Sequence, residues 1–219
     1  MTEVVRVKHC GITSLADAEL CAEAGAWALG MIFFKHSKRR VRMGDAVEIG
    51  AAMNRRVELA GVFVNAVLDD VVMTADQVGL TLIQLHGDEG PAYADEVARR
   101  TGARVIKAAR VAGEGDVRAL GSFQRVDYHL LDAHVPGQPG GTGQTFEWRL
   151  ALQHRGGVPL ILSGGLTPEN VAASIETVRP FAVDVASGTE ASPGVKDVAK
   201  VTAFMEAVAS THVPEEATP

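Results

Sequence analysis

The chain has 219 residues, 47% of them hydrophobic and 22% charged, which predicts one large α/β domain in an ordinary globular protein. The formal net charge of -6 disfavours nucleic acid as a partner, because phosphate backbones are bound by basic surfaces, but backbone amides can still hold a small phosphorylated ligand. The N-terminus lacks the apolar core of a secretory signal, and no apolar run approaches the roughly 18 residues of a membrane span, so we expect a cytoplasmic protein that does not bind membranes.

Short β-branched or apolar runs recur along the chain at intervals of roughly 23 to 31 residues, enough each time for a strand, a loop and a helix. Strands are predicted at Val4–Lys8, Ala28–Phe33, Leu59–Val64, Thr81–Leu85, Arg104–Lys107, Tyr128–Asp132, Pro159–Leu162 and Ala182–Val185. Intervening segments are rich in Ala, Leu, Glu and Lys, with apolar residues three or four positions apart. They predict helices that include Ala16–Ala24, Asp45–Met53, Tyr93–Arg100 and Val195–Val208.

Helix boundaries carry their own signals. Ser14 with Asp17 resembles a capping box, and Thr167 is placed as the N-cap before Pro168 at the first helical position. Helical stretches are followed by residues that favour a left-handed C-cap, namely Gly25, Gly79 and Gly102.

Eight such units predict a single closed (β/α)8 barrel, the TIM-barrel architecture, over residues 1–209. The competing architecture is a doubly wound open sheet, which usually carries a glycine-rich loop after its first strand. Here the first strand ends in Lys8-His9-Cys10-Gly11, without that fingerprint, so the barrel is favoured. The polar tail at 210–219 is expected to be disordered.

Chemistry in such barrels sits at the C-terminal ends of the strands. In the first strand, alternation places Lys8 and Cys10 on one face and His9 on the other. Cys10 is either an active thiol or a small buried hydrophobe, whereas Cys21, in the middle of a helix, is expected to be structural. Two cysteines form no disulfide framework and suit a reducing compartment, and without CxxC, HExxH or a His/Cys cluster we expect no metal.

Three other strand ends carry polar residues. Asp132 closes an apolar strand, and the glycine- and proline-rich segment after it favours a functional carboxylate over a simple helix N-cap. His86 either contacts a substrate or, as we favour slightly, holds a loop through hydrogen bonds. The basic cluster at 35–40 is either a solvated loop or the source of a guanidinium for a substrate carboxylate.

The seventh and eighth strands both end in small residues. Gly164 and Gly165 follow the seventh strand, and Ser187 and Gly188 follow the eighth. Exposed backbone amides at these two adjacent strand ends can bind an anion together, and this is the usual phosphate position in the barrel fold. The sequence therefore predicts a phosphate site there.

Motifs along nearly the whole chain, from Lys8 to about Phe204, resemble the phosphoribosylanthranilate isomerase family. They are Lys8–Thr13, Leu29–Phe33, Gly61–Asn65, Gln84–Glu89, Leu131–Asp132, Gly140–Trp148, Ser163–Val171 and Val183–Glu190. The stretch Gly140–Trp148 is the most distinctive of them. The sequence departs from the family pattern at His9, at Lys38 and Arg40, and at Ala108-Ala109.

The resemblance implies a general base at Cys10, a general acid at Asp132 and a carboxylate-binding guanidinium at Arg39, although Arg40 is the alternative. It places the phosphate at Gly164, Gly165, Ser187 and Gly188. From strand alternation, we further expect Lys8 to stabilise the Cys10 thiolate, with Lys8 and His86 among the substrate contacts.

The implied reaction is an Amadori rearrangement in tryptophan biosynthesis, with a small phosphosugar as substrate and no cofactor. An acid protonates the furanose oxygen, and a base then removes the C2′ proton. The related sugar isomerase of histidine biosynthesis, or an enzyme serving both pathways, is disfavoured because cysteine rather than aspartate ends the first strand. A non-catalytic phosphosugar-binding module is disfavoured because Cys10 and Asp132 are both present. Nothing in the sequence specifies an oligomeric state.

Overall fold

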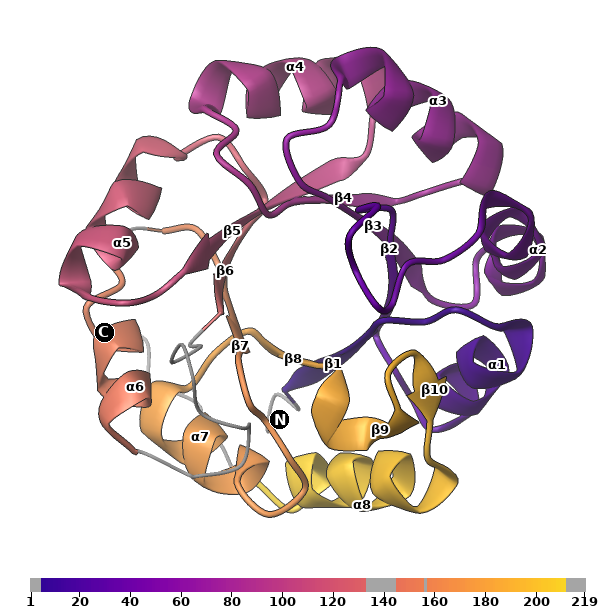
Figure 1. Ribbon diagram of the computed structural model, residues 1–219. Coiled ribbons are helices and arrows are strands. Elements are labelled where there is room, and N and C mark those ends of the chain that lie inside the picture. The colour runs from indigo at the N-terminus through magenta and orange to yellow at the C-terminus, as the bar shows by residue number, and fades with distance from the viewer. Residues whose placement is uncertain (1–4, 133–144, 156, 212–219) are drawn as a thin grey trace.

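The computed structural model describes residues 5–132, 145–155 and 157–211, without the side chains of 145–147. Eight parallel strands close into a barrel in chain order, each pairing with the next and β8 with β1 (Figure 1). They are β1 (Arg6–Cys10), β2 (Ala28–Ile32), β3 (Glu58–Phe63), β4 (Leu82–Leu85), β5 (Arg104–Arg110), β6 (Tyr128–Asp132), β7 (Leu160–Ser163) and β8 (Ala182–Val185). The predicted (β/α)8 barrel and its eight strands are confirmed, with boundaries that shift by a few residues.

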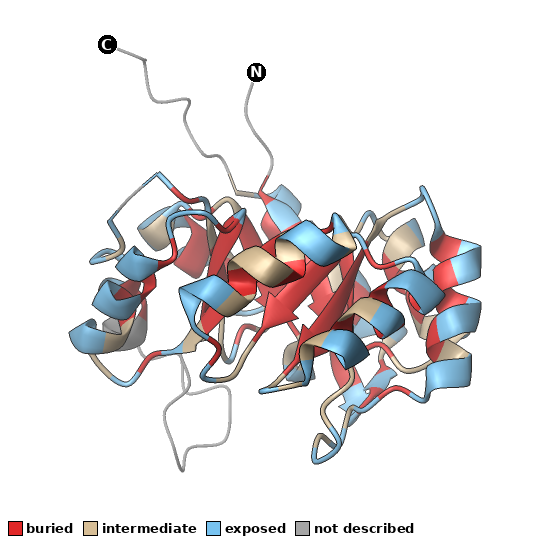
Figure 2. Ribbon diagram, turned by 90° about the horizontal axis from the view of Figure 1, so that it is seen from above, coloured by how far each residue is buried: buried red, intermediate tan, exposed pale blue. Residues whose placement is uncertain are grey.

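Helices follow the strands and form a ring around the barrel (Figure 1). They are α1 (Leu15–Glu23), α2 (Met43–Met53), α3 (Leu68–Val78), α4 (Pro91–Thr101), α5 (Glu114–Ala119), η1 (Leu120–Ser122), α6 (Thr145–Ala151), α7 (Val171–Val178) and α8 (Val198–Ala209). Figure 2 shows that the strands are mostly buried, whereas each helix turns its exposed residues outward. None of the helices in the described part of the chain is both long and apolar enough to cross a membrane.

Alternation along the strands divides the buried side chains into two clusters. The inner cluster fills the barrel with residues such as Leu82, Ile106 and Ile161. At its N-terminal end the rings of Trp27, Tyr128 and Phe181 pack together, with centroids 5.0–5.5 Å apart. The outer cluster joins the strands to the helices. These three rings fill the N-terminal end of the barrel in the described part of the chain.

Most of the predicted helix signals are confirmed. The Ser14 side chain accepts a hydrogen bond from the Asp17 backbone N–H at 3.2 Å, as in half of a capping box. The Asp17 carboxylate accepts instead from the Lys196 backbone N–H at 3.2 Å. The three predicted C-terminal glycines all have positive φ, between 67° and 96°.

Two predicted helix starts are wrong. Helix α7 begins at Val171 with Asn170 at its N-cap, because residues 168–170 form a turn in which the Asn170 side chain accepts a hydrogen bond from Thr167 N–H. The last predicted helix begins at Val198 rather than Val195. The residues before it belong to a small antiparallel hairpin of β9 (Glu190–Ser192) and β10 (Val195–Lys196), which follows the 3-10 turn η2 (Ser187–Thr189).

Two predicted features fall largely outside the described residues. Most of the tail at 210–219 does so, although Ser210 caps α8. The first half of the Gly140–Trp148 motif also lies outside them, and its second half lies in α6.

Candidate active site

A cavity of about 310 Å³ lies at the C-terminal ends of the barrel strands. Its lining comprises Cys10, Ile32, Ser37, Arg39, Val62, Gln84, His86, Asp132, Ser163, Gly164, Gly165, Leu166, Asp184, Val185, Ala186 and Ser187. All but two of the predicted site residues therefore border one space, although they come from six different strand ends. The two exceptions are Lys8 and Gly188.

Cys10 ends strand β1, and a glycine on the neighbouring strand makes room for it. Cys10 pairs with Gly30 of β2, and a Cβ atom at Gly30 would lie 2.9 Å from the Cys10 sulfur. The thiol is 7% exposed. Burial raises its pKa, and the nearby Lys8 ammonium, which acts in the opposite direction, does not fully offset that effect.

Lys8 shares the inward face of β1 with Cys10, as predicted, but it does not line the cavity. Its ammonium is fully buried and donates to Asp184 Oδ1 of β8 at 2.7 Å. Burial acts to lower the pKa of Lys8, but the Asp184 carboxylate and the Cys10 side chain together outweigh it, so the pKa is raised. The predicted substrate contact is corrected accordingly, because Lys8 lies outside the lining and its charge is already neutralised by Asp184, a carboxylate that lines the cavity.

Asp184 is a site residue that the sequence analysis missed. It also accepts a hydrogen bond from the Ser163 hydroxyl at 3.1 Å, so it connects the ends of β7, β8 and β1. The signal that could have found it is a carboxylate at an inward position of an otherwise apolar strand.

Asp132 ends strand β6 and faces His86, whose Nε2 lies 3.5 Å from Asp132 Oδ2. The other ring nitrogen, Nδ1, lies 3.3 Å from the amide nitrogen of Gln84. With the Gln84 amide in this orientation, Nδ1 accepts and the imidazole proton lies on Nε2, the atom that faces the carboxylate. His86 also borders a second cavity of about 520 Å³ on the side of α5. His86 therefore borders the cavity, and its ring contacts a side chain of strand β4 rather than a loop, so the predicted substrate contact stays a prediction.

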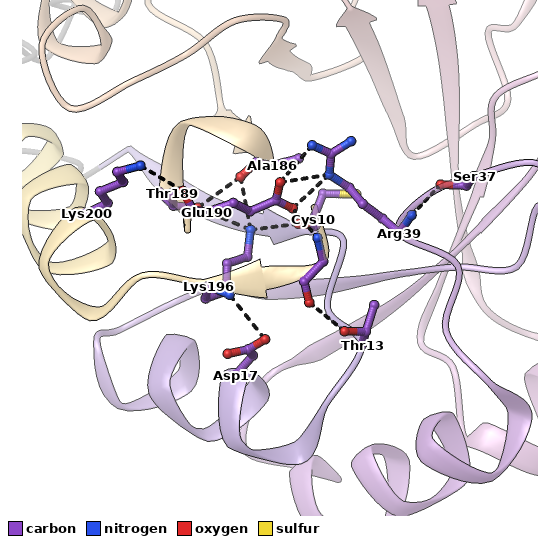
Figure 3. A network of polar contacts seen from close by, with 11 residues as sticks. Cys10, Thr13, Asp17, Ser37, Arg39, Ala186, Thr189, Glu190, Lys196 and Lys200 are labelled. Carbon is purple, nitrogen blue, oxygen red and sulfur yellow. Dashed lines mark hydrogen bonds and ion pairs between the residues drawn. The ribbon is translucent and has the colours of Figure 1, made fainter. Parts of the chain in front are cut away.

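Arg39 enters the cavity from the loop after β2, whereas Arg40 is exposed and does not line it. The Arg39 guanidinium makes a fork with Glu190, with Nε–Oε1 and Nη2–Oε2 distances of 2.7 Å. Figure 3 shows this pair at the centre of a polar network around the β9–β10 hairpin. Sequence analysis missed Glu190 and Lys196 of this network.

The loops after β7 and β8 meet beside the cavity. Gly164 and Gly165 have positive φ values of 95° and 66°, which favour glycine. A Cβ atom at Gly188 would lie 1.9 Å from the carbonyl oxygen of Leu166, so only glycine allows the two loops to approach this closely. Gly188 therefore supports the cavity wall rather than lining it, while Ser187 lines it directly.

Comparison with known proteins identifies the family. A family model described as N-(5'-phosphoribosyl)anthranilate (PRA) isomerase matches residues 7–207. The chain belongs to the phosphoribosylanthranilate isomerase family. Membership makes it an isomerase, as the sequence motifs predict.

Family members with similar sequences and structures cover almost the whole chain. The N-(5'-phosphoribosyl)anthranilate isomerase of Citrifermentans bemidjiense is 48% identical over 90% of this chain and 94% of its own length. That of Geobacter sulfurreducens is 48% identical over 92% of this chain and 97% of its own length. The crystal structure of the Thermotoga maritima isomerase has a TM-score of 0.85 and 42% identity, covering 94% of this chain and 98% of its own.

Another solved structure of a phosphoribosylanthranilate isomerase contains a ligand. It is a complex with reduced 1-(o-carboxyphenylamino)-1-deoxyribulose 5-phosphate. Its TM-score is 0.81 and its identity 38%, and the match covers 94% of this chain and 98% of that one.

Proposed function

We propose that this chain converts N-(5-phosphoribosyl)anthranilate to 1-(2-carboxyphenylamino)-1-deoxyribulose 5-phosphate in tryptophan biosynthesis, with Cys10 as general base and Asp132 as general acid. The observation that carries this proposal is that Cys10 and Asp132, from β1 and β6, border the same cavity as Arg39 and the small-residue loops after β7 and β8. One space therefore offers a base, an acid, a cation for a carboxylate and a phosphate site. The phosphosugar bound by a relative with the same fold supports a substrate of this class.

The reaction needs two proton transfers at different atoms. Asp132 gives a proton to the furanose oxygen, so the ring opens to a Schiff base, and Cys10 then removes the C2′ proton to give an enolamine that tautomerises to the product. The His86 Nε2–H, 3.5 Å from Asp132 in this structure, is placed to donate to the carboxylate that remains after its proton has left. The rearrangement involves no net redox change. When the ring oxygen is protonated, the bond between it and C1′ breaks as the nitrogen lone pair forms the Schiff base, and the other steps are proton transfers that side chains can perform.

The two ends of the substrate have separate partners. Backbone amides at Gly164, Gly165 and Ser187 hold the phosphate, with Gly188 keeping their loops together. Arg39 meets the anthranilate carboxylate. Lys8 and Asp184 fix the strand ends beneath the sugar. Holding both ends of the substrate places C2′ and the ring oxygen between base and acid.

Replacing the acid and the base tests the assignment. We expect Cys10→Ser and Asp132→Asn each to lower kcat by about two to four decades, because a positioned acid or base contributes that much. The measurement is the loss of phosphoribosylanthranilate fluorescence with purified protein.

A matched control is Cys21→Ala, which removes the other cysteine, fully buried in α1, and should leave the rate near that of the wild type. A folded Cys10→Ala protein with near wild-type kcat would refute the role of Cys10 as general base.

A further inference from the structure

Lys196 is a buried lysine that the mechanism above does not use. It lies on β10, is 6% exposed, and its ammonium donates to three oxygen atoms: the carbonyls of Cys10 at 2.9 Å and Ala186 at 3.1 Å, and the Thr189 hydroxyl at 3.1 Å. Figure 3 shows these three contacts converging on one nitrogen. All three acceptors are neutral, which is unusual for a buried charge.

Two other buried lysines show the contrast. Lys8 pairs with Asp184 at 2.7 Å, and Lys107 pairs with Glu89 at 2.9 Å. By comparison, no carboxylate among the described residues comes within 4.0 Å of the Lys196 nitrogen. Its positive charge is therefore left without a directly bonded counter-charge, and burial lowers its pKa.

The acceptors of Lys196 stand at the ends of two neighbouring barrel strands. Cys10 is the last residue of β1, and Ala186 follows the last residue of β8 and precedes Ser187. One ammonium thus joins the backbone that carries the thiol to the backbone that begins the loop after β8. The hairpin that carries Lys196 is itself fixed, because Thr13 donates to the Gly194 carbonyl at 2.6 Å.

The charges around the Cys10 thiol come from four strands, β1, β8, β9 and β10, and from the loop after β2. Lys8 on β1 is paired with Asp184 on β8, and Arg39 in the loop after β2 is paired with Glu190. Each of these cations is offset by a carboxylate. The ammonium of Lys196 on β10 is the cation near the thiol that has no such partner in the described chain, and it acts to lower the pKa of Cys10.

We propose that Lys196 is a positioning residue for the general base. Its ammonium fixes the end of β1 against the loop after β8 and adds a positive charge, not held in an ion pair, that favours the Cys10 thiolate over the thiol. The proposal rests on the proposed function in that Cys10 acts as the base.

The test follows the alkylation of Cys10 by iodoacetamide as a function of pH, in a Cys21→Ala background so that one cysteine remains. We expect Lys196→Met to move the midpoint of the alkylation profile upward by about one pH unit, the size of effect that a nearby charge has on a thiol. Lys196→Arg keeps the charge, so its alkylation midpoint should lie close to that of the wild type. At neutral pH, kcat should fall about tenfold in Lys196→Met with little change in KM, because the thiolate fraction falls in proportion.

Lys196→Gln covers the case in which Lys196→Met does not fold, since it retains a hydrogen-bond donor without the charge. A folded Lys196→Gln protein should show the same upward shift. The matched control is Lys200→Met. Lys200 is exposed and donates to the Glu190 carbonyl at 2.8 Å rather than to Cys10, so the alkylation midpoint of this variant should not change.

A lower melting temperature with an unchanged alkylation midpoint would overturn the proposal, because a merely structural lysine would give that result. An equal shift in Lys200→Met would overturn it too. Failure of the proposed function is distinguishable, since it would appear as activity in Cys10→Ala while the alkylation profiles still report on Lys196.

Discussion

The guanidinium of Arg39 has two edges, and the structure uses one of them. Nε and Nη2 bond the carboxylate of Glu190, which leaves Nη1 and the second hydrogen of Nη2 for another planar anion. A substrate carboxylate can therefore still be bound through two parallel hydrogen bonds. Glu190 holds the guanidinium in place before the substrate arrives, which reduces the entropy lost on binding.

Arg39→Ala tests this role. We expect kcat/KM to fall by about one to three decades, mainly through weaker substrate binding, because a hydrogen-bonded charge pair in a partly enclosed site is lost. Steady-state kinetics measure the fall, and thermal unfolding checks that the loss of the Glu190 partner has not unfolded the protein. Arg40→Ala, which changes an exposed residue, is the control. If Arg40→Ala caused the damage and Arg39→Ala did not, the assignment would be off by one position.

His9 is a polar residue in the outer core, and its burial lowers the stability of the protein. Its side chain is fully buried against the ring of Phe204, at a centroid distance of 6.1 Å, and neither ring nitrogen has a hydrogen-bond partner among the described residues. A buried polar group without a partner costs about 1–3 kcal/mol. We therefore expect His9→Leu to raise the free energy of unfolding by about 1–2 kcal/mol, measured by urea denaturation. A control at an exposed site, His36→Leu, should stay within about 0.5 kcal/mol of the wild type.

The lowered pKa of His9 also predicts that the protein loses stability at acidic pH. Burial lowers the pKa of His9 to about 3 from 6.5. Between these values the unfolded chain binds a proton that the native protein does not, so the free energy of unfolding falls as pH is lowered through this window, by at most about 1.4 kcal/mol per pH unit. The gain from His9→Leu should therefore be larger at pH 5 than at pH 7. An equal gain at both values would show that the His9 imidazole is not held neutral.

At the scale of elements, the loops after β7 and β8 form one unit because a glycine allows them to touch. Gly188→Ala would place a Cβ atom 1.9 Å from the Leu166 carbonyl oxygen, so the loops must move apart. We expect KM to rise by about one decade or more, because hydrogen bonds to a charged phosphate are worth roughly 1.5–3 kcal/mol each. Gly44→Ala is the matched control. Its Cβ atom would meet open space in helix α2, where alanine is favoured, so KM should not change. A folded Gly188→Ala protein with unchanged KM would place the phosphate elsewhere.

The strands of the barrel could be predicted from the sequence pattern, whereas the β9–β10 hairpin could not. The eight strands could be predicted because alternation and β-branched residues are local properties. The β9–β10 hairpin could not, because Val195 and Lys196 continue the apolar spacing of α8 and resemble its first turn. Contacts from other elements decided the outcome: the Asp17 side chain accepts from the Lys196 backbone, and the Lys196 ammonium reaches Cys10.

At the scale of the whole molecule, the barrel closes where β8 meets β1, and a buried ion pair lies on that seam. Lys8 and Asp184 are register partners as well as ion-pair partners. Removing one partner of a buried pair leaves an uncompensated charge, which typically costs about 3–5 kcal/mol. We expect Asp184→Asn to lower the free energy of unfolding by that amount, as measured with denaturant.

The double variant Lys8→Met with Asp184→Leu is the control for this cost. It removes both charges together, so most of the lost stability should return, although the cavity loses the Asp184 carboxylate. Equal instability in the single and double variants would show that packing, rather than the unpaired charge, is responsible.

The sequence alone determined the barrel, the order of its strands and the positions of Cys10, Asp132 and the small-residue loops, because these depend on periodicity and on which residue ends each strand. Only the tertiary structure decided which charged side chains form ion pairs with one another. Asp184 neutralises Lys8 across 176 positions of sequence, and Glu190 holds Arg39 across 151. Lys8 was therefore predicted as a substrate contact, whereas its ammonium is paired with Asp184 and does not line the cavity. Such pairs form only when the closed barrel brings distant strand ends together, and no local pattern of residues records which charge will meet which.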